Sequence, residues 1–238
     1  MHTCLNCGNT YEKNFCNECG QKAVRRFSIK GVLHDLPHSV FHVDKGIMKN
    51  VKSILHPQES VFGYIHGKRV SFFNPVLFFL LTLGFIMLAE HFMGKELEYI
   101  MNLEAWDGKM YDVGAILSTN FKYMLLFAAF LFALPSYFLY KKSSGFNYAE
   151  QVVSYIFIMG YMNVAYLLFL PFPFMGNYPF NYATPAALLL FTGLVFRQKN
   201  ILLSLIKPVI IIGIGFGLFI AFNVCMGFLV ILIQQLSH

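Results

Sequence analysis

The chain has 238 residues, of which 57% are hydrophobic and 13% are charged. Soluble globular proteins carry about 25% charged residues, so this composition excludes an ordinary soluble domain and predicts a membrane protein. The formal net charge is +6, and residues 1–74 hold ten Lys or Arg, whereas no formally charged side chain follows Lys207. The chain therefore divides into a polar head and an apolar body.

Residues 4–20 read CLNCGNTYEKNFCNECG and contain two C-x-x-C-G motifs. Two residues between cysteines allow a tight turn to aim both thiolates at one ion, and the following glycine accepts the backbone conformation that such a turn requires. The spacing predicts a structural zinc site in a ribbon over 1–22, with all four coordination positions filled and none left for a substrate. The predicted ligands are Cys4, Cys7, Cys16 and Cys19.

The first twenty residues hold four cysteines and no apolar signal segment. We therefore expect the head to lie in the cytosol, where cysteines more often bind metal than form disulfides. A redox dithiol and an iron centre remain alternatives, because thiolates alone do not select the metal. Nucleic-acid binding is disfavoured, since Lys13 is opposed by Glu12 and Glu18 and a four-thiolate zinc centre adds further negative charge.

The segment 23–74 is basic and lies between the ribbon and the first span. Within it Ile47, Val51, Ile54 and Leu55 recur at helical spacing, which predicts an amphipathic helix. Such a helix either lies on the inner leaflet, where lysines attract anionic lipid, or packs against the ends of the spans. The residues predicted to contact the membrane surface are Lys45, Lys49, Lys52, Lys68 and Arg69.

Five of the eight histidines lie in the same segment, namely His34, His38, His42, His56 and His66. His38 and His42 are four residues apart and would share a helix face, so a second metal site or a pH sensor is one hypothesis. The alternative is that these histidines are interfacial side chains, because no cluster of carboxylates lies nearby to complete a site.

Long apolar runs predict the membrane spans, because about 20 helical residues cross the hydrocarbon layer. The approximate spans are 75–93, 121–140, 151–170, 182–196 and 208–234. Pro75, Pro185 and Pro208 lie near the starts of their runs, where the missing amide hydrogen costs nothing. The run 182–196 is short, and if it is re-entrant the count falls from five spans to four. The predicted fold class is an all-α polytopic membrane protein with a small N-terminal zinc ribbon and a transmembrane bundle over 75–238.

Lys and Arg orient the spans, because cytosolic loops carry an excess of both. Cytosolic placement of residues 1–74, 141–149 and 197–207 collects 15 of the 18 Lys and Arg. The opposite segment, 94–120, carries five acids and only two lysines. Five spans with a cytosolic head predict a bacterial inner-membrane protein whose C-terminal His238 lies outside the cytosol.

Few polar side chains interrupt the spans. They are Glu90, His91, Asn163 and Asn223, and we expect them to bond across helices rather than to line a transport path. In the last span, small residues recur every four positions and predict a face for close helix packing, within the chain or with a second copy in a homo-oligomer. This helix-packing face consists of Gly213, Gly217, Ala221 and Cys225.

The C-x-x-C-G pair, together with HVDKGIMKNVKSILHPQESVFGYIHGKRVSFFNPVLFFLL, resembles the bacterial domain-of-unknown-function family 3667. The most specific positions are Pro57, Tyr64, Gly67, Lys68, Arg69 and Pro75. The resemblance covers the ribbon, residues 41–81 and, loosely, the multi-span body, and it implies an architecture but no activity. A more distant similarity is to Yip-type membrane proteins, for which five spans and a cytosolic N-terminal region accompany a role in membrane organisation and partner binding.

The sequence shows no nucleophile paired with a base, no pair of catalytic carboxylates, no phosphate-binding glycine loop and no open metal site. We therefore expect a non-catalytic inner-membrane scaffold or adaptor whose cytosolic zinc ribbon docks a protein partner. The alternatives are a small transporter or channel subunit that uses the interior of the bundle, and a lipid-acting enzyme that uses the histidine-rich segment.

Overall fold

The computed structural model describes residues 1–24, 26–30, 46–70, 72–93, 102–104, 110–112, 121–170 and 183–236. Five of the residues singled out from the sequence lie outside this part of the chain, namely His34, His38, His42, Lys45 and His238. The helices are α2 (Gly46–Lys52), α3 (Pro57–Ile65), α4 (Pro75–Phe92), α6 (Phe121–Ser144), α7 (Tyr148–Phe169), α8 (Ala183–Val195) and α9 (Ile201–Leu236), and a 3-10 turn, η1 (Ser53–Leu55), follows α2.

Four short strands form two antiparallel pairs. In the ribbon β1 (His2–Thr3) pairs with β2 (Thr10–Tyr11), with His2 opposite Tyr11. The segment 94–120, which we expected only as a connection between spans, contains β3 (Asn102–Glu104) paired with β4 (Met110–Asp112). The described fold is therefore predominantly but not wholly helical.

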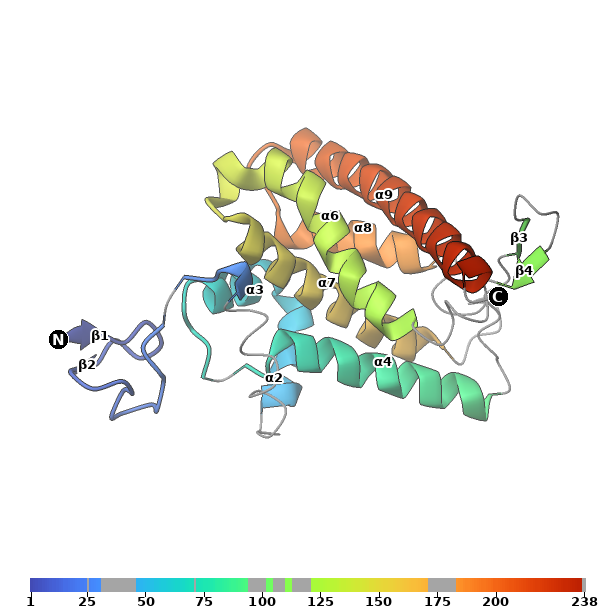
Figure 1. Ribbon diagram of the computed structural model, residues 1–238. Helices are drawn as coiled ribbons and strands as arrows, with labels where there is room; N and C mark the ends of the chain where they lie inside the picture. The colour runs from blue at the N-terminus through green and yellow to red at the C-terminus, as the bar shows by residue number, and fades with distance from the viewer. Residues whose placement is uncertain are drawn as a thin grey trace.

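The helices form one body with the ribbon at one end (Figure 1). Helix α7 packs against α4, α6 and α8, and α9 covers α6 and α8. The ribbon and the far end of α9 lie at opposite ends of this body (Figure 1). The short helices α2 and α3 lie between the ribbon and the long helices, and α3 contacts α7 and α8.

Helix α7 is the centre of the hydrophobic core. Within its most apolar 18-residue window 78% of the residues are buried, against 24% for α9. Large side chains such as Tyr155, Phe157 and Tyr161 are completely enclosed on α7. Helix α9, in contrast, has 36 residues, a length of about 54 Å at 1.5 Å per residue, and exposes most of its apolar side chains. Exposed Ile, Leu and Val on a long helix are what a hydrocarbon environment favours.

Among the described residues, four helices are long and apolar enough to cross a membrane, namely α4, α6, α7 and α9, as expected of a multi-pass membrane protein. The fifth expected run forms α8, which has 13 residues and extends only about 20 Å. A helix of this length falls short of the roughly 30 Å hydrocarbon layer. The structure thus supplies four full-length helices where the sequence predicted five.

Two helices begin earlier than the sequence analysis predicted, and each has a capping side chain at its start. Asn147 caps α7, and its partner Glu150 completes a capping box, so α7 begins at Tyr148 and not at 151. Asn200 Oδ1 accepts the N–H of Leu202 (3.0 Å), so α9 begins at Ile201. Our expectation that Pro208 lies at a helix start was wrong, because α9 begins about two turns earlier and Pro208 lies inside it.

Polar side chains inside the body form hydrogen bonds, mostly between helices. Asn163 Nδ2 donates to Thr82 Oγ1 (3.1 Å), which joins α7 to α4. Tyr166 OH donates to Glu90 Oε1 (2.7 Å) between the same two helices. Asn223 instead bonds within its own helix, to the carbonyl of Phe219. Except for the Asn223 bond, these contacts are those expected of polar groups that join helices.

A further polar pair between helices escaped the sequence analysis. Ser136 Oγ donates to Gln151 Oε1 (3.0 Å), and both side chains are fully buried between α6 and α7. The apolar run 151–170 places Gln151 at the edge of a span, where a polar side chain needs no partner on another helix. Gln151 lies in fact inside the first turn of α7, facing α6.

The predicted helix-packing face lies on the outside of α9. Gly213, Gly217, Ala221 and Cys225 are all exposed, and a Cβ added to either of these glycines would meet no atom of the described chain within 4 Å. The close helix approach within the chain is instead at Gly215, where an added Cβ would collide with the ring of Phe132 on α6. Gly215 lies on the opposite side of α9 from the predicted face.

This difference predicts opposite effects for two neighbouring substitutions in α9. Gly215→Leu should destabilise the protein by about 1–3 kcal/mol, because the new side chain must displace Phe132 and overpack the contact with α6. Gly217→Leu is the matched control and should leave the monomer as stable as the wild type, since the space around Gly217 is open. Thermal unfolding in detergent measures both, and equal midpoints for the two variants would contradict the assigned packing.

Candidate metal centre and its attachment to the helices

The ribbon consists of two turns with the same hydrogen-bond pattern. In the first, the Gly8 N–H donates to the Cys4 carbonyl (2.9 Å), and in the second the Gly20 N–H donates to the Cys16 carbonyl (2.9 Å). Both glycines have positive φ, 81° at Gly8 and 71° at Gly20. This backbone conformation disfavours a side chain, which explains the glycine after each C-x-x-C.

The two turns bring the four predicted ligands together. Cys4 Sγ lies 3.5 Å from Cys19 Sγ, and Cys7 Sγ lies 3.6 Å from Cys16 Sγ. All four sulfur atoms lie within 4.8 Å of one another. Four thiolates around a tetrahedral zinc ion, with Zn–S bonds of about 2.3 Å, would have S–S separations near 3.8 Å. The cluster can therefore hold one metal ion.

Backbone N–H groups favour the ionised form of two of the four thiols, those of Cys4 and Cys16. The N–H of Cys7 lowers the pKa of Cys4, and the N–H of Cys19 lowers the pKa of Cys16 to about 6. At Cys7 the N–H of Asn9 acts in the same direction, but burial and the three neighbouring thiols outweigh it and raise the pKa to about 12. Without a cation the cluster does not carry four thiolates at neutral pH. A bound divalent ion supplies the charge that makes complete ionisation favourable.

The ribbon has almost no apolar core apart from the ligands. Tyr11 is buried against Cys4 and Cys16, and the remaining order comes from the β1–β2 pair and a bridge between Phe15 and Lys22. A segment this small cannot offset its loss of conformational entropy by burial alone. We therefore expect metal binding to supply most of its folding free energy.

The ribbon also contacts the segment just before the first span. A Cβ built on Gly67 would lie 2.5 Å from Leu5 Cδ1, and Gly67 has a φ of +110°, so glycine is required here for both space and conformation. The Arg69 N–H donates to the buried Gln21 Oε1 (3.1 Å). These contacts hold the ribbon against the turn that follows α3.

A charged contact joins the residues after the ribbon to the start of α7. Arg26 Nε and Nη2 donate to the two carboxylate oxygens of Glu150 at 2.8 and 2.9 Å, and Nη2 also donates to the Gly145 carbonyl (2.8 Å). Glu150 is nearly fully buried and is the same carboxylate that completes the capping box of α7. Asn147 Nδ2 donates to the Phe27 carbonyl (3.0 Å) alongside. The sequence analysis did not predict this contact, although N-x-x-E at 147–150 was a readable capping signal.

The juxtamembrane segment packs against the helical body through buried polar groups. Asn50 exchanges two hydrogen bonds with the backbone of Phe73, at 3.0 and 3.1 Å. Ser53 Oγ lies 2.7 Å from Tyr161 OH, which joins this segment to α7. The segment thus packs against the helical body, and its contact with the inner leaflet stays a prediction.

The residues predicted to contact the membrane surface differ in what surrounds them. Lys49, Lys52 and Lys68 are exposed, with Lys49 Nζ 4.6 Å from the ring centroid of Phe72. Arg69 is instead turned inward, with its guanidinium 3.8 Å from the ring centroid of Phe27.

The described histidines of this segment do not gather into a site. His56 lies at the start of α3 and His66 at its end, and both are exposed. In the part of the chain that the structure describes, the four cysteines are the one group of three or more candidate metal ligands.

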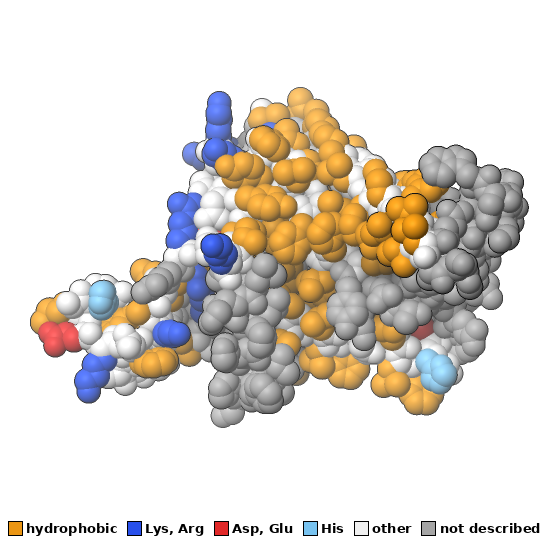
Figure 2. Space-filling view, in the orientation of Figure 1, with side chains coloured by type: hydrophobic (Ala, Val, Ile, Leu, Met, Phe, Trp, Pro, Cys, Tyr) orange, Lys and Arg blue, Asp and Glu red, His pale blue; other side chains and the backbone are white. Residues whose placement is uncertain are grey.

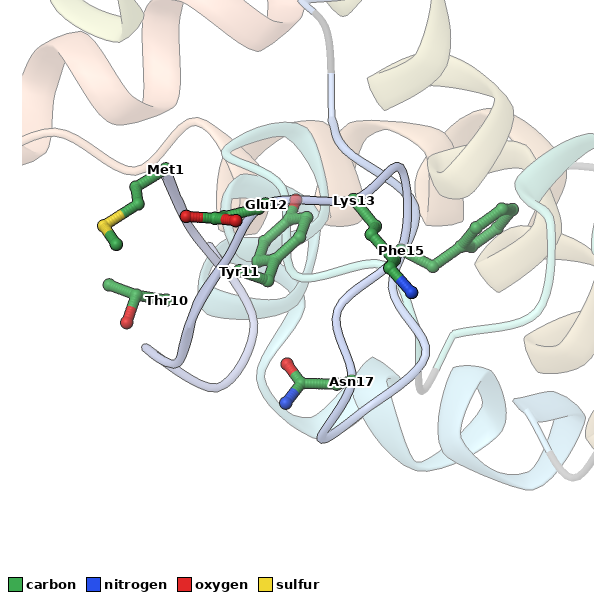
Figure 3. A pocket seen from close by; sticks show the side chains of 7 residues that line it. All are labelled: Met1, Thr10, Tyr11, Glu12, Lys13, Phe15 and Asn17. Atoms are coloured by element: carbon green, nitrogen blue, oxygen red, sulfur yellow. The ribbon is translucent and has the colours of Figure 1, made fainter.

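The ribbon has an open pocket of about 460 Å³. Its lining residues are Met1, Thr10, Tyr11, Glu12, Lys13, Phe15 and Asn17. Figure 3 shows the Tyr11 ring between Met1 and Lys13, with the Phe15 ring at the opposite border from Met1. Phe15 is 58% exposed although it is aromatic. The pocket combines apolar side chains with one acidic and one basic side chain and has no metal ligand in its lining.

No protein-family model, no curated protein and no solved structure matches this chain. The function is therefore argued from the geometry of the metal centre, its attachment to the helices and the surfaces around it.

The cysteine cluster predicts that the protein binds a metal ion and that substitution of two of the ligands abolishes this binding. Replacing Cys16 and Cys19 with serine should abolish binding of about one zinc ion per chain, because two of the four thiolates are lost. Residues 1–22 should then become sensitive to protease. Elemental analysis of purified protein measures the zinc, and Cys225→Ser is the control, since this cysteine lies far along the chain in α9. Zinc-free wild-type protein prepared without chelators would refute the assignment.

The contact between Arg26 and Glu150 predicts that the ribbon stabilises the start of α7. Arg26→Gln should lower the stability by about 1 kcal/mol, a modest amount because the guanidinium is largely exposed. Amide hydrogen exchange should rise in the first turn of α7 as well as in the ribbon. Lys22→Gln removes a nearby cation that has no ion pair in the described structure and should change neither quantity. Unaltered exchange at the start of α7 in Arg26→Gln would contradict the coupling.

Proposed function

We propose that the chain is a non-catalytic membrane adaptor whose zinc ribbon docks a protein partner at the membrane surface. The observation that carries this proposal is a ribbon with a closed four-thiolate cluster, held against the helices on one side and exposing apolar side chains elsewhere.

The metal cluster supports a structural role for the ion. A tetrahedral ion bound by four cysteines has no coordination position for water or substrate, unlike catalytic zinc, which keeps one open. The ion that we propose is zinc, because paired C-x-x-C turns supply the thiolates and the geometry that zinc prefers. The ribbon would then act as a rigid surface and not as a reaction centre.

The attachment of the ribbon supports a docking role. Contacts at Leu5, Gln21 and Arg26 fix the ribbon relative to the helices, so a bound partner would be held at a defined place and angle. Pre-organisation of this kind lowers the entropic cost of binding. The exposed Phe15 and the pocket beside it are the surface that we assign to the partner (Figure 3). Aromatic side chains of this kind commonly dominate the binding energy of an interface.

The membrane placement that we propose is a bacterial inner membrane with the ribbon in the cytosol. We place the end of α9 outside although α8 is short, because this end lies at the opposite end of the helical body from the ribbon (Figure 1). The support for the cytosolic ribbon is the distribution of Lys and Arg, of which 15 of 18 fall in the segments assigned to the cytosol. We also propose membership of the domain-of-unknown-function family 3667, on the motifs of the ribbon and of residues 41–81.

A small transporter is the second candidate, because a buried ionisable residue in a span often marks a transport path. Glu90 near the end of α4 is such a residue. Its Oε1, however, accepts a hydrogen bond from Tyr166, and Asn163 bonds to Thr82 on the same pair of helices. These polar groups are engaged in joining α4 to α7, so we favour the adaptor.

The docking surface predicts a selective loss of partner binding. In affinity capture from native membranes with the full chain, Phe15→Ser should reduce the amount of captured partner at least tenfold. A tenfold weaker affinity corresponds to about 1.4 kcal/mol of binding free energy, which is expected when an aromatic anchor is removed. Zinc content should be unchanged, because Phe15 is not a ligand. Leu55→Ser is the matched control, since Leu55 is also an exposed apolar residue before the first span but lies outside the ribbon. Equal capture by the wild type and Phe15→Ser would exclude this surface as the docking site.

A further inference from the structure

Two loops at the ribbon end of the helical body form one continuous surface. The first, 141–147, consists of the last turn of α6 and the connection to α7, and the second, 196–200, joins α8 to α9. Gln198 Nε2 donates to Ser143 Oγ (2.9 Å) between them. Lys207 Nζ in turn donates to Gln198 Oε1 (3.2 Å), which holds the second loop against the first turns of α9. The two loops are therefore fixed relative to each other.

This surface carries uncompensated positive charge. Its exposed cations are Lys141, Lys142, Arg197 and Lys199. Neither loop contains an Asp or Glu, and the acid nearest to them in sequence, Glu150, is occupied by Arg26. Within the described residues that contact is the one ion pair, so these four cations have no carboxylate partner there. The cluster would therefore attract an anion.

The neighbouring basic residues are engaged within the protein and do not compete for this role. Arg26 donates to Glu150 from Nε and Nη2, and Arg69 stacks on Phe27 and donates from Nε to the Tyr64 carbonyl (3.3 Å). Arg69 was one of the residues that the sequence predicted to contact the membrane. Exposed lysines without an ion pair in the described structure also lie on the ribbon, on α2 and at Lys68, but the two loops bring four exposed cations together beside the long helices.

Exposed apolar side chains continue directly from the two loops onto the long helices. Phe138 on α6 is 73% exposed, and Ile201 and Leu205 on α9 are 77% and 64% exposed. Figure 2 shows Lys and Arg side chains gathered along the edge of the broad hydrophobic surface, on the side where the ribbon lies. A border between cations and exposed hydrocarbon-type side chains is the arrangement found at a membrane interface.

We propose that the two loops bind the phosphate headgroup of an anionic phospholipid, whose acyl chains lie against α6 and α9. Arginine and lysine both donate to phosphate oxygens, and arginine can do so with two parallel hydrogen bonds. The apolar side chains beside the cations select a lipid over a free anion or an acidic protein, because they would bind the acyl chains of the same molecule. This inference depends on the membrane placement of the helices and not on docking by the ribbon.

The test uses the full-length protein in nanodiscs made of zwitterionic phosphatidylcholine, with phosphatidylglycerol added as the probe. Arg197→Gln combined with Lys199→Gln should weaken phosphatidylglycerol binding tenfold or more, because each cation near an anionic lipid contributes about a fivefold factor. Native mass spectrometry counts the retained lipid. The matched control, Lys13→Gln with Lys22→Gln, removes two cations from the ribbon and should leave lipid retention at the wild-type level.

Three results would overturn the proposal. One is equal retention of phosphatidylcholine and phosphatidylglycerol by the wild type, and another is an equal loss in the control variant. The third is displacement of the bound lipid by millimolar inorganic phosphate, which would mean that the apolar side chains contribute nothing. Partner capture by the ribbon is measured on the same variants and should be unaffected, so a failure of lipid binding is distinguishable from a failure of the adaptor function.

Discussion

The carboxylate of Glu150 is the point on which the two halves of the molecule depend. It caps the first turn of α7 by accepting a hydrogen bond from the Asn147 N–H (2.8 Å). It also accepts hydrogen bonds from Nε and Nη2 of Arg26, which lies in the chain just after the ribbon. A buried carboxylate without such partners would be strongly disfavoured. The segment after the ribbon therefore adds stability to the first turn of the central helix, and the same contact positions the ribbon relative to that helix.

The local features could be predicted from the sequence, and the contacts between distant segments could not. Two C-x-x-C-G motifs determine their own turns, because the ligands and the glycine that each turn needs lie within five residues. Apolar runs likewise indicate helices wherever they are long. The contact of Arg26 with Glu150 joins residues 124 positions apart, and no spacing rule reports a pairing of that kind. The two early helix starts are a different case, because the capping residues Asn147 and Asn200 can be recognised in the sequence. The apolar runs alone place both starts too late.

The helix-packing face shows that a repeat of small residues can be present without facing the rest of the chain, and its contact with a second copy stays a prediction. Small residues at every fourth position of α9 do make a stripe, but the chain packs Gly215, which lies outside it, against Phe132. Which side of a helix faces its neighbours depends on the rest of the bundle, and in α9 nearly every position is apolar. A helix that is hydrophobic all round contains no periodic signal for the buried side.

Helix α9 is also much longer than a bilayer is thick. Its part beyond Lys207, from Pro208 to Ile233, has no charged side chain and would extend about 40 Å, whereas the hydrocarbon layer measures about 30 Å. Tilt of the helix or local thickening of the lipid must absorb the excess, and both cost free energy that falls as the surrounding membrane becomes thicker. Because α9 is the helix with the largest exposed apolar surface, this hydrophobic mismatch acts on the whole protein. The length of α9 alone would then favour partition of the protein into thicker regions of the membrane.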